Sequence, residues 1–328
     1  MMPTTNSTAE LKLAAATSPF AGGLLAIDDL TGAQILEVLD LAAAVKANPK
    51  AYAGMLSGLS VTMLFEKPSL RTRMSFEIGL TKLGAHVVYL DHSKSKLGER
   101  EAVKDYAKNL ERWTDAIVAR VFKNTVLQEL SGNASIPVVN ALCDVEHPCQ
   151  ALADVLTLRE AFGSLDGLKV AYVGDGNNVC HSLMLACAKL GVDFTAVTPK
   201  GFEPQFGVVK AATAAAQETD ATITISRSIG DIKGHHAVYT DTWVSMGQEH
   251  QTNLRGGEFT HLQVDDEVMA IASEGLESPA VFMHCLPAHR GEEVTDDVID
   301  SAQSLVYEQA ENRMWAQNAL MLKVFGKQ

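Results

Sequence analysis

Short apolar runs typical of buried strands alternate with helical patterns along most of the chain, and this alternation occurs twice. In the first half, strands are predicted at residues 60–65, 85–90, 116–120 and 137–140, with helices at 75–83 and 103–110. The pattern begins again with strands predicted at 168–173, 194–197, 221–225, 237–240 and 280–283. Strands that alternate with helices form parallel sheets covered by helices on both faces. We therefore expect an α/β fold with two doubly wound parallel-sheet domains.

An unbroken helical pattern over residues 150–162 lies between the two halves, and we interpret it as a helix that joins two domains. The chain has 328 residues, which is enough for two domains of ordinary size. We expect the first domain to span residues 1–153 and the second to span 154–310. Apolar periodicity near the end predicts a last helix, about 311–328, that packs back onto the first domain.

Composition excludes several classes of partner. The net charge of −13 argues against nucleic acid or an anionic membrane, so an anionic substrate would need a local basic cluster. No apolar run is long enough to cross a bilayer. The five cysteines are scattered and no pair has the spacing of zinc ligands, so we expect no metal. Because no secretory signal precedes the first domain, we expect a cytoplasmic chain with reduced thiols.

The sharpest local motif is FEKPSLRTR, residues 65–73, between a predicted strand and a predicted helix. Pro68 restricts the loop, and Ser69 is a good helix N-cap. The N–H groups and dipole of a helix N-terminus suit phosphate, and Arg71 and Arg73 add charged donors. On composition alone, a phosphate site and a capped helix with two solvated arginines fit this motif equally well. It is not a Walker loop, because it lacks the Gly-Lys-Ser/Thr sequence.

Two further motifs lie at the middle of the chain. His147 and Gln150, in HPCQ, can face one ligand from the start of the joining helix, although a capping histidine with a surface glutamine is the commoner case. The sequence GDGNN, residues 174–178, follows a predicted strand and invites a dinucleotide interpretation. Val179 stands where that fingerprint needs glycine, so a turn whose asparagines bind a small polar ligand fits as well.

The last two motifs also follow predicted strands, at the end of a parallel sheet where ligands bind. Asp241, in DTWVSMG, can hold a substrate ammonium or cap a helix. In HCLPAHRGEE, residues 284–293, Cys285 is either a reactive thiol or an ordinary buried cysteine. His284 is a poor base for Cys285, because adjacent residues on a strand point to opposite faces.

Taken in this order, the five motifs resemble the ornithine carbamoyltransferases, a branch of the aspartate/ornithine carbamoyltransferase superfamily, from about Phe65 to Leu320. The SxRTR loop is typical of carbamoyltransferases in general, whereas DxxxSMG and HCLP are typical of the ornithine branch. The resemblance implies transfer of the carbamoyl group from carbamoyl phosphate to the δ-amine of L-ornithine, giving L-citrulline and phosphate without a cofactor. It also implies that the first domain binds carbamoyl phosphate and the second binds ornithine.

The resemblance assigns roles to individual residues. Carbamoyl phosphate would be bound by Ser69, Leu70 through its backbone N–H, Arg71, Thr72, Arg73, Arg120, His147, Gln150, Cys285, Leu286 and Arg313. Ornithine would be bound by Asn178, Asp241, Ser245 and Met246. Thr72, Arg120 and His147 would stabilise negative charge on the carbamoyl oxygen. Asp241 and Cys285 would orient the amine and assist the loss of its proton.

The resemblance further implies a homotrimer or a multiple of trimers, in which residues 92–101 of a neighbouring subunit, with Lys96, complete each site. Three alternatives stand beside it: a carbamoyltransferase for another amine such as putrescine, a dinucleotide-dependent oxidoreductase and a non-catalytic regulatory relative. The oxidoreductase hypothesis explains none of the SLRTR loop. The non-catalytic hypothesis is disfavoured, because every motif residue with a chemical role is present.

Overall fold

The computed structural model describes residues 19–244 and 257–327. The chain forms two compact units. Among the described residues, the first unit contains those up to Asp29, Ala33–Asp144 and those from Arg313 onward, and the second contains Leu30–Gly32 and Val145–Asn312. In this part of the chain, no helix is both long enough and apolar enough to span a membrane.

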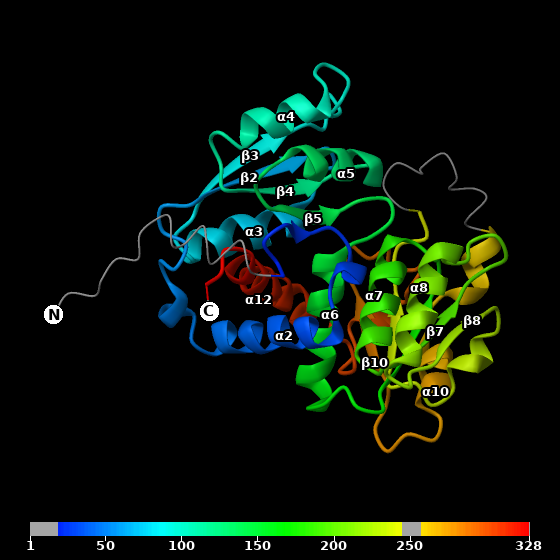
Figure 1. Cartoon of the computed structure of the whole chain (residues 1–328). Helices are drawn as coiled ribbons and strands as arrows, with labels where there is room; N and C mark the ends of the chain where they lie inside the picture. The colour runs from blue at the N-terminus through cyan, green and yellow to red at the C-terminus, as the bar shows by residue number, and fades with distance from the viewer. Residues whose placement is uncertain (1–18, 245–256, 328) are drawn as a thin grey trace. The chain divides into compact units, whose positions relative to one another are not determined.

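The first unit is built on a parallel sheet with the strand order β1-β5-β4-β2-β3. Its strands are β1 (Gly23–Leu24), β2 (Ser60–Phe65), β3 (His86–Asp91), β4 (Ala116–Arg120) and β5 (Val138–Leu142). Its helices include α2 (Gly32–Ala47), α3 (Leu70–Lys82), α4 (Val103–Leu110) and α5 (Asn124–Asn133). Figure 1 shows α4 and α5 over one face of the sheet and α3 over the other. The strands β2, β4 and β5 are accordingly buried along nearly their whole length.

The last helix, α12 (Val306–Val324), begins in the second unit, and its residues from Arg313 onward belong to the first. It packs closely on α3 at Gly79, where an added Cβ would lie 2.2 Å from Oδ1 of Asn318. A glycine is therefore what lets α3 approach this helix so closely. The predicted return of the C-terminal helix to the first half of the chain is confirmed.

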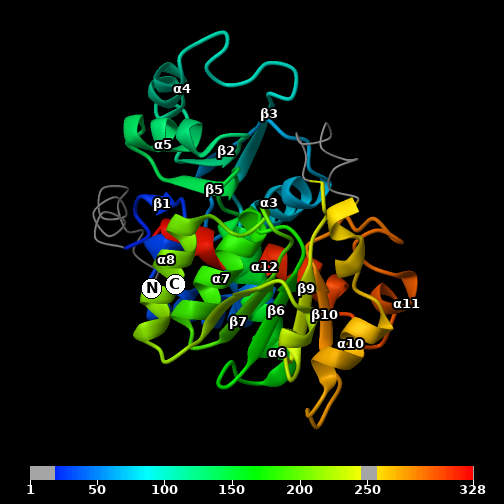
Figure 2. The same cartoon turned by 90° about the vertical axis from the view of Figure 1, so that its right-hand side faces the viewer.

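The second unit is also built on a parallel sheet, in the order β10-β9-β6-β7-β8. Its strands are β6 (Lys169–Val173), β7 (Asp193–Val197), β8 (Ile223–Ser226), β9 (Ala237–Thr240) and β10 (Val281–His284). Its helices include α6 (Pro148–Phe162), α7 (Asn178–Lys189), α8 (Phe206–Gln217), α10 (Asp266–Ser273) and α11 (Asp296–Ile299). Figure 2 shows α7 and α8 on one side of this sheet and α10 with α11 on the other. An apolar core that includes Val173, Val238 and Phe282 lies under α10.

The prediction of two parallel-sheet α/β domains is confirmed, and each predicted strand corresponds to an observed one. Strand β1 has two residues and gave no pattern in the sequence. Helix α3 begins at Leu70, directly after the Ser69 cap, whereas the apolar spacing indicated a start at Ser75. The first turn of α3 is mostly polar, so periodicity alone could not reveal it. The whole of α6 lies in the second unit, whereas the sequence placed its first residues in the first domain.

Candidate functional site

In the first unit, the motif that follows β2 gathers positive charge around one hydroxyl. Thr72 is 1% exposed, and its Oγ1 accepts hydrogen bonds from Nη1 of Arg120 and Nη2 of Arg313, each over 3.3 Å. Both arginines are buried, one at the end of β4 and the other on α12. Two guanidiniums that converge in a buried place favour an anion there, and the N-terminus of α3 adds its dipole. This part of the first unit is therefore suited to a phosphate group.

The other members of the loop take different positions. Ser69 caps α3, its Oγ accepting from the Thr72 N–H over 3.3 Å, while the side chain of Leu70 is 72% exposed. Arg71 is half-buried. Arg73 is exposed, pairs with Glu77 over 3.0 Å, and lies 3.9 Å from the ring centroid of Tyr89. The pairing with Glu77 raises the pKa of Arg73. The structure thus directs the guanidinium of Arg73 to Glu77 and Tyr89.

Two residues of the motif for which no role was predicted, Glu66 and Lys67, are both buried. The carboxylate of Glu66 accepts from the N–H groups of Leu97 and Phe122, each over 2.8 Å. It therefore fixes the segment that carries Lys96 and the segment that follows β4. The ammonium groups of Lys67 and Lys96 each lie 4.8 Å from the ring centroid of Phe122. Two charged residues directly after a buried strand were the signal available in the sequence.

Burial is the largest effect on Lys67, followed by the nearby Arg120 guanidinium, and together they lower its pKa to about 8. The pKa is raised by three nearby groups, Asp144, Cys143 and Glu66, but by less than the first two effects lower it. The ammonium of Lys67 thus lies buried near the guanidinium of Arg120, and two cations in one place favour an anionic ligand in the first unit.

In the second unit, His147 and Gln150 lie at the start of α6. His147 is the N-cap residue of α6, and its N–H donates to Oγ of Ser182 over 2.8 Å. Ser182 in turn donates to the carboxylate of Glu146 over 2.9 Å. Nε2 of Gln150 donates to Oδ1 of Asp154 over 2.7 Å. The amino group of Gln150 is therefore turned to Asp154.

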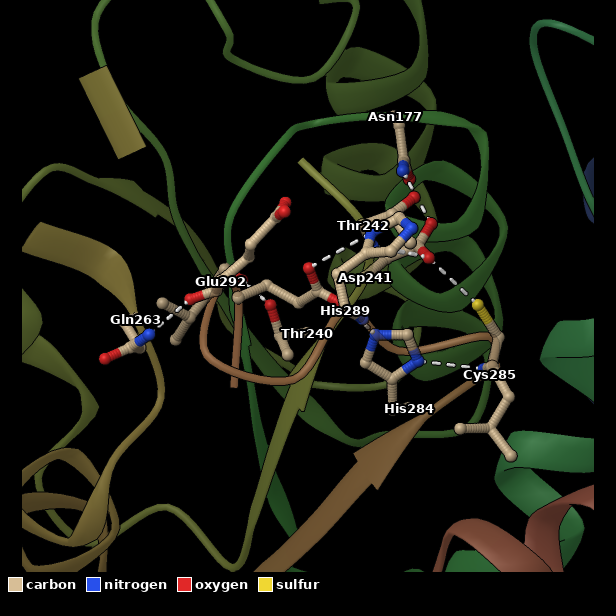
Figure 3. A network of polar contacts seen from close by, with 12 residues as sticks. Asn177, Thr240, Asp241, Thr242, Gln263, His284, Cys285, His289 and Glu292 are labelled. Atoms are coloured by element: carbon tan, nitrogen blue, oxygen red, sulfur yellow. Dashed lines mark hydrogen bonds and ion pairs between the residues drawn. The ribbon is translucent and has the colours of Figure 1, made fainter. Parts of the chain in front are cut away.

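Asp241 follows β9 and lies between two partners, as Figure 3 shows. Its Oδ2 accepts from Nδ2 of Asn177 over 2.8 Å, and its Oδ1 accepts from Sγ of Cys285 over 3.1 Å. Asn177 also caps α7, because its Oδ1 accepts from the N–H groups of Val179 and Cys180. The sequence pointed to Asn178, whose Oδ1 accepts from the N–H of Val179 over 3.1 Å. Sequence reasoning therefore missed Asn177, although GDGNN contains it.

The turn after β6 argues against a dinucleotide site. The side chain of Asn177 occupies the first N–H groups of α7, where the Rossmann fold places a pyrophosphate. A Cβ at Gly176 would lie 2.3 Å from the backbone nitrogen of Pro204, so this glycine serves the packing of the turn.

The loop after β10 holds Cys285 and Leu286 through His284. The N–H of Leu286 donates to Nδ1 of His284 over 2.8 Å, so Nε2 carries the proton and donates to Glu293 over 3.2 Å. His284 and Glu293 are fully buried. Leu286 has a φ of 58°, an unfavourable value for leucine, which the bond to His284 helps to maintain. Both ring nitrogens of His284 are engaged away from Cys285, in agreement with the prediction that it is a poor base for that thiol.

Two groups of side chains in the described residues have the composition of metal ligands: Asp241 with His284 and Cys285, and His289 with Glu292 and Glu293. In the first group, hydrogen bonds to Leu286, Glu293 and Asp241 already engage the ligand atoms. In the second, His289 and Glu292 are exposed. The expectation that the chain needs no metal stays a prediction. Ser245 and Met246, predicted to bind ornithine, lie outside the described residues.

Two protein-family profiles match the chain. The "Aspartate/ornithine carbamoyltransferase, carbamoyl-P binding domain" matches residues 23–160, and the "Aspartate/ornithine carbamoyltransferase, Asp/Orn binding domain" matches residues 166–324. These two matches divide the chain close to the end of α6.

Known proteins of similar sequence include the ornithine carbamoyltransferase of Shewanella oneidensis, 49% identical over 301 residues that cover 92% of this chain and 98% of that protein. That of Methanocorpusculum labreanum is 44% identical over 305 residues, covering 92% and 97%. Among solved structures, ornithine carbamoyltransferase from Pyrococcus furiosus has a TM-score of 0.89 and 43% identity, covering 94% of this chain and 99% of that one. The chain therefore belongs to the aspartate/ornithine carbamoyltransferase family.

Proposed function

We propose that this chain is an ornithine carbamoyltransferase, which transfers the carbamoyl group of carbamoyl phosphate to the δ-amine of L-ornithine. Relatives named for this activity are 44–49% identical to it over more than nine-tenths of its length. The observation that carries the proposal is the convergence of the Arg120 and Arg313 guanidiniums on the buried hydroxyl of Thr72. A phosphorylated substrate supplies the anion that this arrangement favours.

Arg71, Thr72, Arg120 and Arg313 hold the phosphate in this proposal, together with the capped start of α3 at Ser69 and the N–H of Leu70. Arg73 has the weakest case among the predicted ligands, because Glu77 and Tyr89 engage its guanidinium. Lys67 joins the set, since its buried ammonium adds positive charge beside Arg120. Lys96 of a neighbouring subunit would complete the site in an oligomer.

His147, Gln150 and the carbonyl of Leu286 hold the carbamoyl group, and Asp241 with Cys285 holds the amine. The carboxylate of Asp241 is fixed by Asn177, so its position for a substrate ammonium is set before ornithine binds. Asn178, Ser245 and Met246 hold the amino-acid end of ornithine. The two neutral donors Asn177 and Cys285 leave the negative charge of Asp241 available to a cation.

The reaction begins when the neutral δ-nitrogen attacks the carbamoyl carbon, so the ammonium of free ornithine must first lose a proton. Negative charge then develops on the carbamoyl oxygen, where Thr72, Arg120 and His147 are the stabilising donors. As the bond between the carbon and the phosphate oxygen breaks, phosphate departs into the arginine cluster, whose charge already matches it. One of the two protons on the attacking nitrogen passes to the departing phosphate, and citrulline and phosphate are the products.

A homotrimer, or a multiple of trimers, is part of the same proposal, with residues 92–101 entering a neighbouring site. Three large apolar side chains of α3 support self-association: Leu70, Met74 and Ile78 are 72%, 45% and 40% exposed. They are spaced four residues apart and so form one stripe along the helix. We also place the protein in the cytoplasm, as its sequence predicts.

The test is a citrulline assay with carbamoyl phosphate and a panel of amines: ornithine, putrescine, aspartate and acetylornithine. The proposal expects turnover with ornithine and at most traces with the others. Turnover with putrescine in preference to ornithine would establish the alternative carbamoyltransferase. Absence of turnover with every amine, in a folded protein that binds carbamoyl phosphate, would indicate a non-catalytic relative.

A further inference from the structure

Asp154 is a fully buried carboxylate on α6, in the second unit. Its Oδ1 accepts two hydrogen bonds, from Nε2 of Gln150 over 2.7 Å and from Nε2 of Gln309 over 2.6 Å. The three side chains are each no more than 1% exposed. The proposed reaction uses Gln150 and gives no role to Asp154. Burying a carboxylate carries a large desolvation cost, which hydrogen bonds from its partners offset only in part.

A main-chain donor fixes the orientation of the whole group. The N–H of His284 donates to Oε1 of Gln309 over 3.0 Å, so the amino group of Gln309 must face Asp154. A carboxylate oxygen that faces an amide can only accept from its amino group. Gln150 therefore also turns its amino group to Asp154, and its carbonyl oxygen is directed away from that carboxylate.

We propose that Asp154 is a positioning residue that makes Gln150 an acceptor for the amino group of carbamoyl phosphate. This inference rests on the proposed function. The carbamoyl NH₂ offers two donors, and an inward-facing Nε2 of Gln150 would set one amino group against another. Asp154 prevents that arrangement. It thereby sets a preference for a carbamoyl phosphate over an acyl phosphate, in which a methyl group replaces the amino group.

The same anchor reaches the loop that carries Cys285. Gln309 bonds Asp154 and the phenol of Tyr239 with its amino group, the latter over 3.1 Å, and it bonds the end of β10 with its carbonyl. The carboxylate of Asp154 therefore holds the Gln150 amide directly and the Cys285 loop through Gln309. Cys285 itself lies directly after His284, the residue whose N–H starts the chain of bonds.

The test compares three ligands in wild type and in Asp154→Ala: the KM for carbamoyl phosphate, the inhibition constant of acetyl phosphate and that of inorganic phosphate. Removing Asp154 lets the Gln150 amide turn, so the preference for carbamoyl over acetyl phosphate is expected to fall about tenfold. The affinity for inorganic phosphate is expected to stay within about twofold, because the phosphate residues lie in the first unit. Asp154→Asn keeps a carbonyl acceptor and is expected to restore most of the preference.

Thr157→Val is the matched control, because Thr157 is buried on the same helix about two turns after Gln150 and bonds Asn312 over 3.0 Å. It should leave the preference unchanged. If Asp154→Ala does not fold, Asp154→Leu, whose apolar side chain leaves no cavity, makes the same measurement. An unchanged preference, or an equal loss of affinity for all three ligands, overturns the inference. Wild type that makes no citrulline would instead overturn the proposed function.

Discussion

The thiol of Cys285 donates a hydrogen bond to Oδ1 of Asp241 over 3.1 Å, across 44 residues of sequence. Asn177 holds the other carboxylate oxygen over 2.8 Å, so the acid is fixed from both sides. A thiol that donates to a carboxylate directs its proton at that carboxylate, so Asp241 orients the side chain of Cys285. The arrangement suits a cysteine that orients an amine and does not attack the substrate.

Cys285→Ser is therefore expected to keep the hydrogen bond to Asp241 and to retain measurable turnover, with a raised KM for ornithine. Asp241→Asn should be far more damaging, because it removes the charge that holds the substrate ammonium, a loss on the order of 2–4 kcal/mol. Steady-state kinetics with citrulline detection measures both. A carbamoylated Cys285 trapped on the pathway and found by mass spectrometry would make the cysteine a nucleophile instead.

The arginine cluster gives a second prediction. Arg71→Ala and Arg120→Ala are each expected to lower kcat/KM and to retain the fold. The fall in kcat/KM should correspond to a loss of about 2–4 kcal/mol in transition-state stabilisation. Arg73→Ala is the matched control from the same helix turn, and it should have a smaller effect because Glu77 and Tyr89 engage that guanidinium. Equal losses in all three variants would show that Arg73 leaves Glu77 to bind phosphate.

The sequence was sufficient for strands β2 to β10 and for the parallel character of both sheets, because buried strands and amphipathic helices each leave a local period. It was also sufficient for Ser69 as a cap, since that bond spans three residues. Contacts across the fold were beyond local patterns: Arg313 and Thr72 are 241 residues apart, and only the family resemblance joined them.

Three of the residues that sequence reasoning missed share one property: they act on another protein group. Glu66 holds backbone N–H groups, Asn177 holds Asp241, and Asp154 holds Gln150. Such roles depend on which atom of a side chain faces which partner, and residue spacing carries no information on that. The start of α3 was placed too late for a related reason, because a cap and a polar first turn define a helix start without apolar periodicity.

The close packing of α3 on α12 predicts a stability effect. Gly79→Ala places a methyl group 2.2 Å from Oδ1 of Asn318 and 3.2 Å from Cγ of Met314. We expect a loss of about 1–3 kcal/mol in the free energy of unfolding, measured by thermal or denaturant melting. Gly132→Ala, on α5, meets no atom within 4 Å and should stabilise by about 0.5–1 kcal/mol. A neutral Gly79→Ala would mean that the Asn318 side chain moves aside freely.

The apolar stripe of α3 predicts an oligomer interface. Met74→Glu puts a charge at the middle of Leu70, Met74 and Ile78, and we expect it to shift the assembly towards smaller species. Light scattering coupled to size-exclusion chromatography measures the mass. Leu36→Glu is the control, because Leu36 is similarly exposed, at 42%, but lies on α2. A mass that Met74→Glu leaves unchanged would remove α3 from the interface.

The last prediction concerns pH and Lys67. Burial and the Arg120 guanidinium lower the pKa of Lys67 to about 8, from an ordinary value of 10.5. Between these two values the unfolded chain binds a proton on this lysine that the folded chain does not. Stability that depends on Lys67 must therefore rise with pH across this window.

Lys67→Met should accordingly raise the melting temperature below pH 8, where the wild-type protein buries a charged ammonium, and this gain should shrink as the pH approaches 10.5. Binding of carbamoyl phosphate should respond in the opposite sense. The KM of the wild-type protein should increase as Lys67 loses its charge above pH 8. The KM of Lys67→Met should be higher than that of wild type at neutral pH, by roughly two- to tenfold. It should also stay nearly constant as the pH rises from 8 to 10.5. Lys123→Met is the control, because that exposed lysine pairs with Asp144 over 3.1 Å, another neighbour of Lys67. The same KM profile in wild type and Lys67→Met would show that Lys67 takes no part in binding the phosphate.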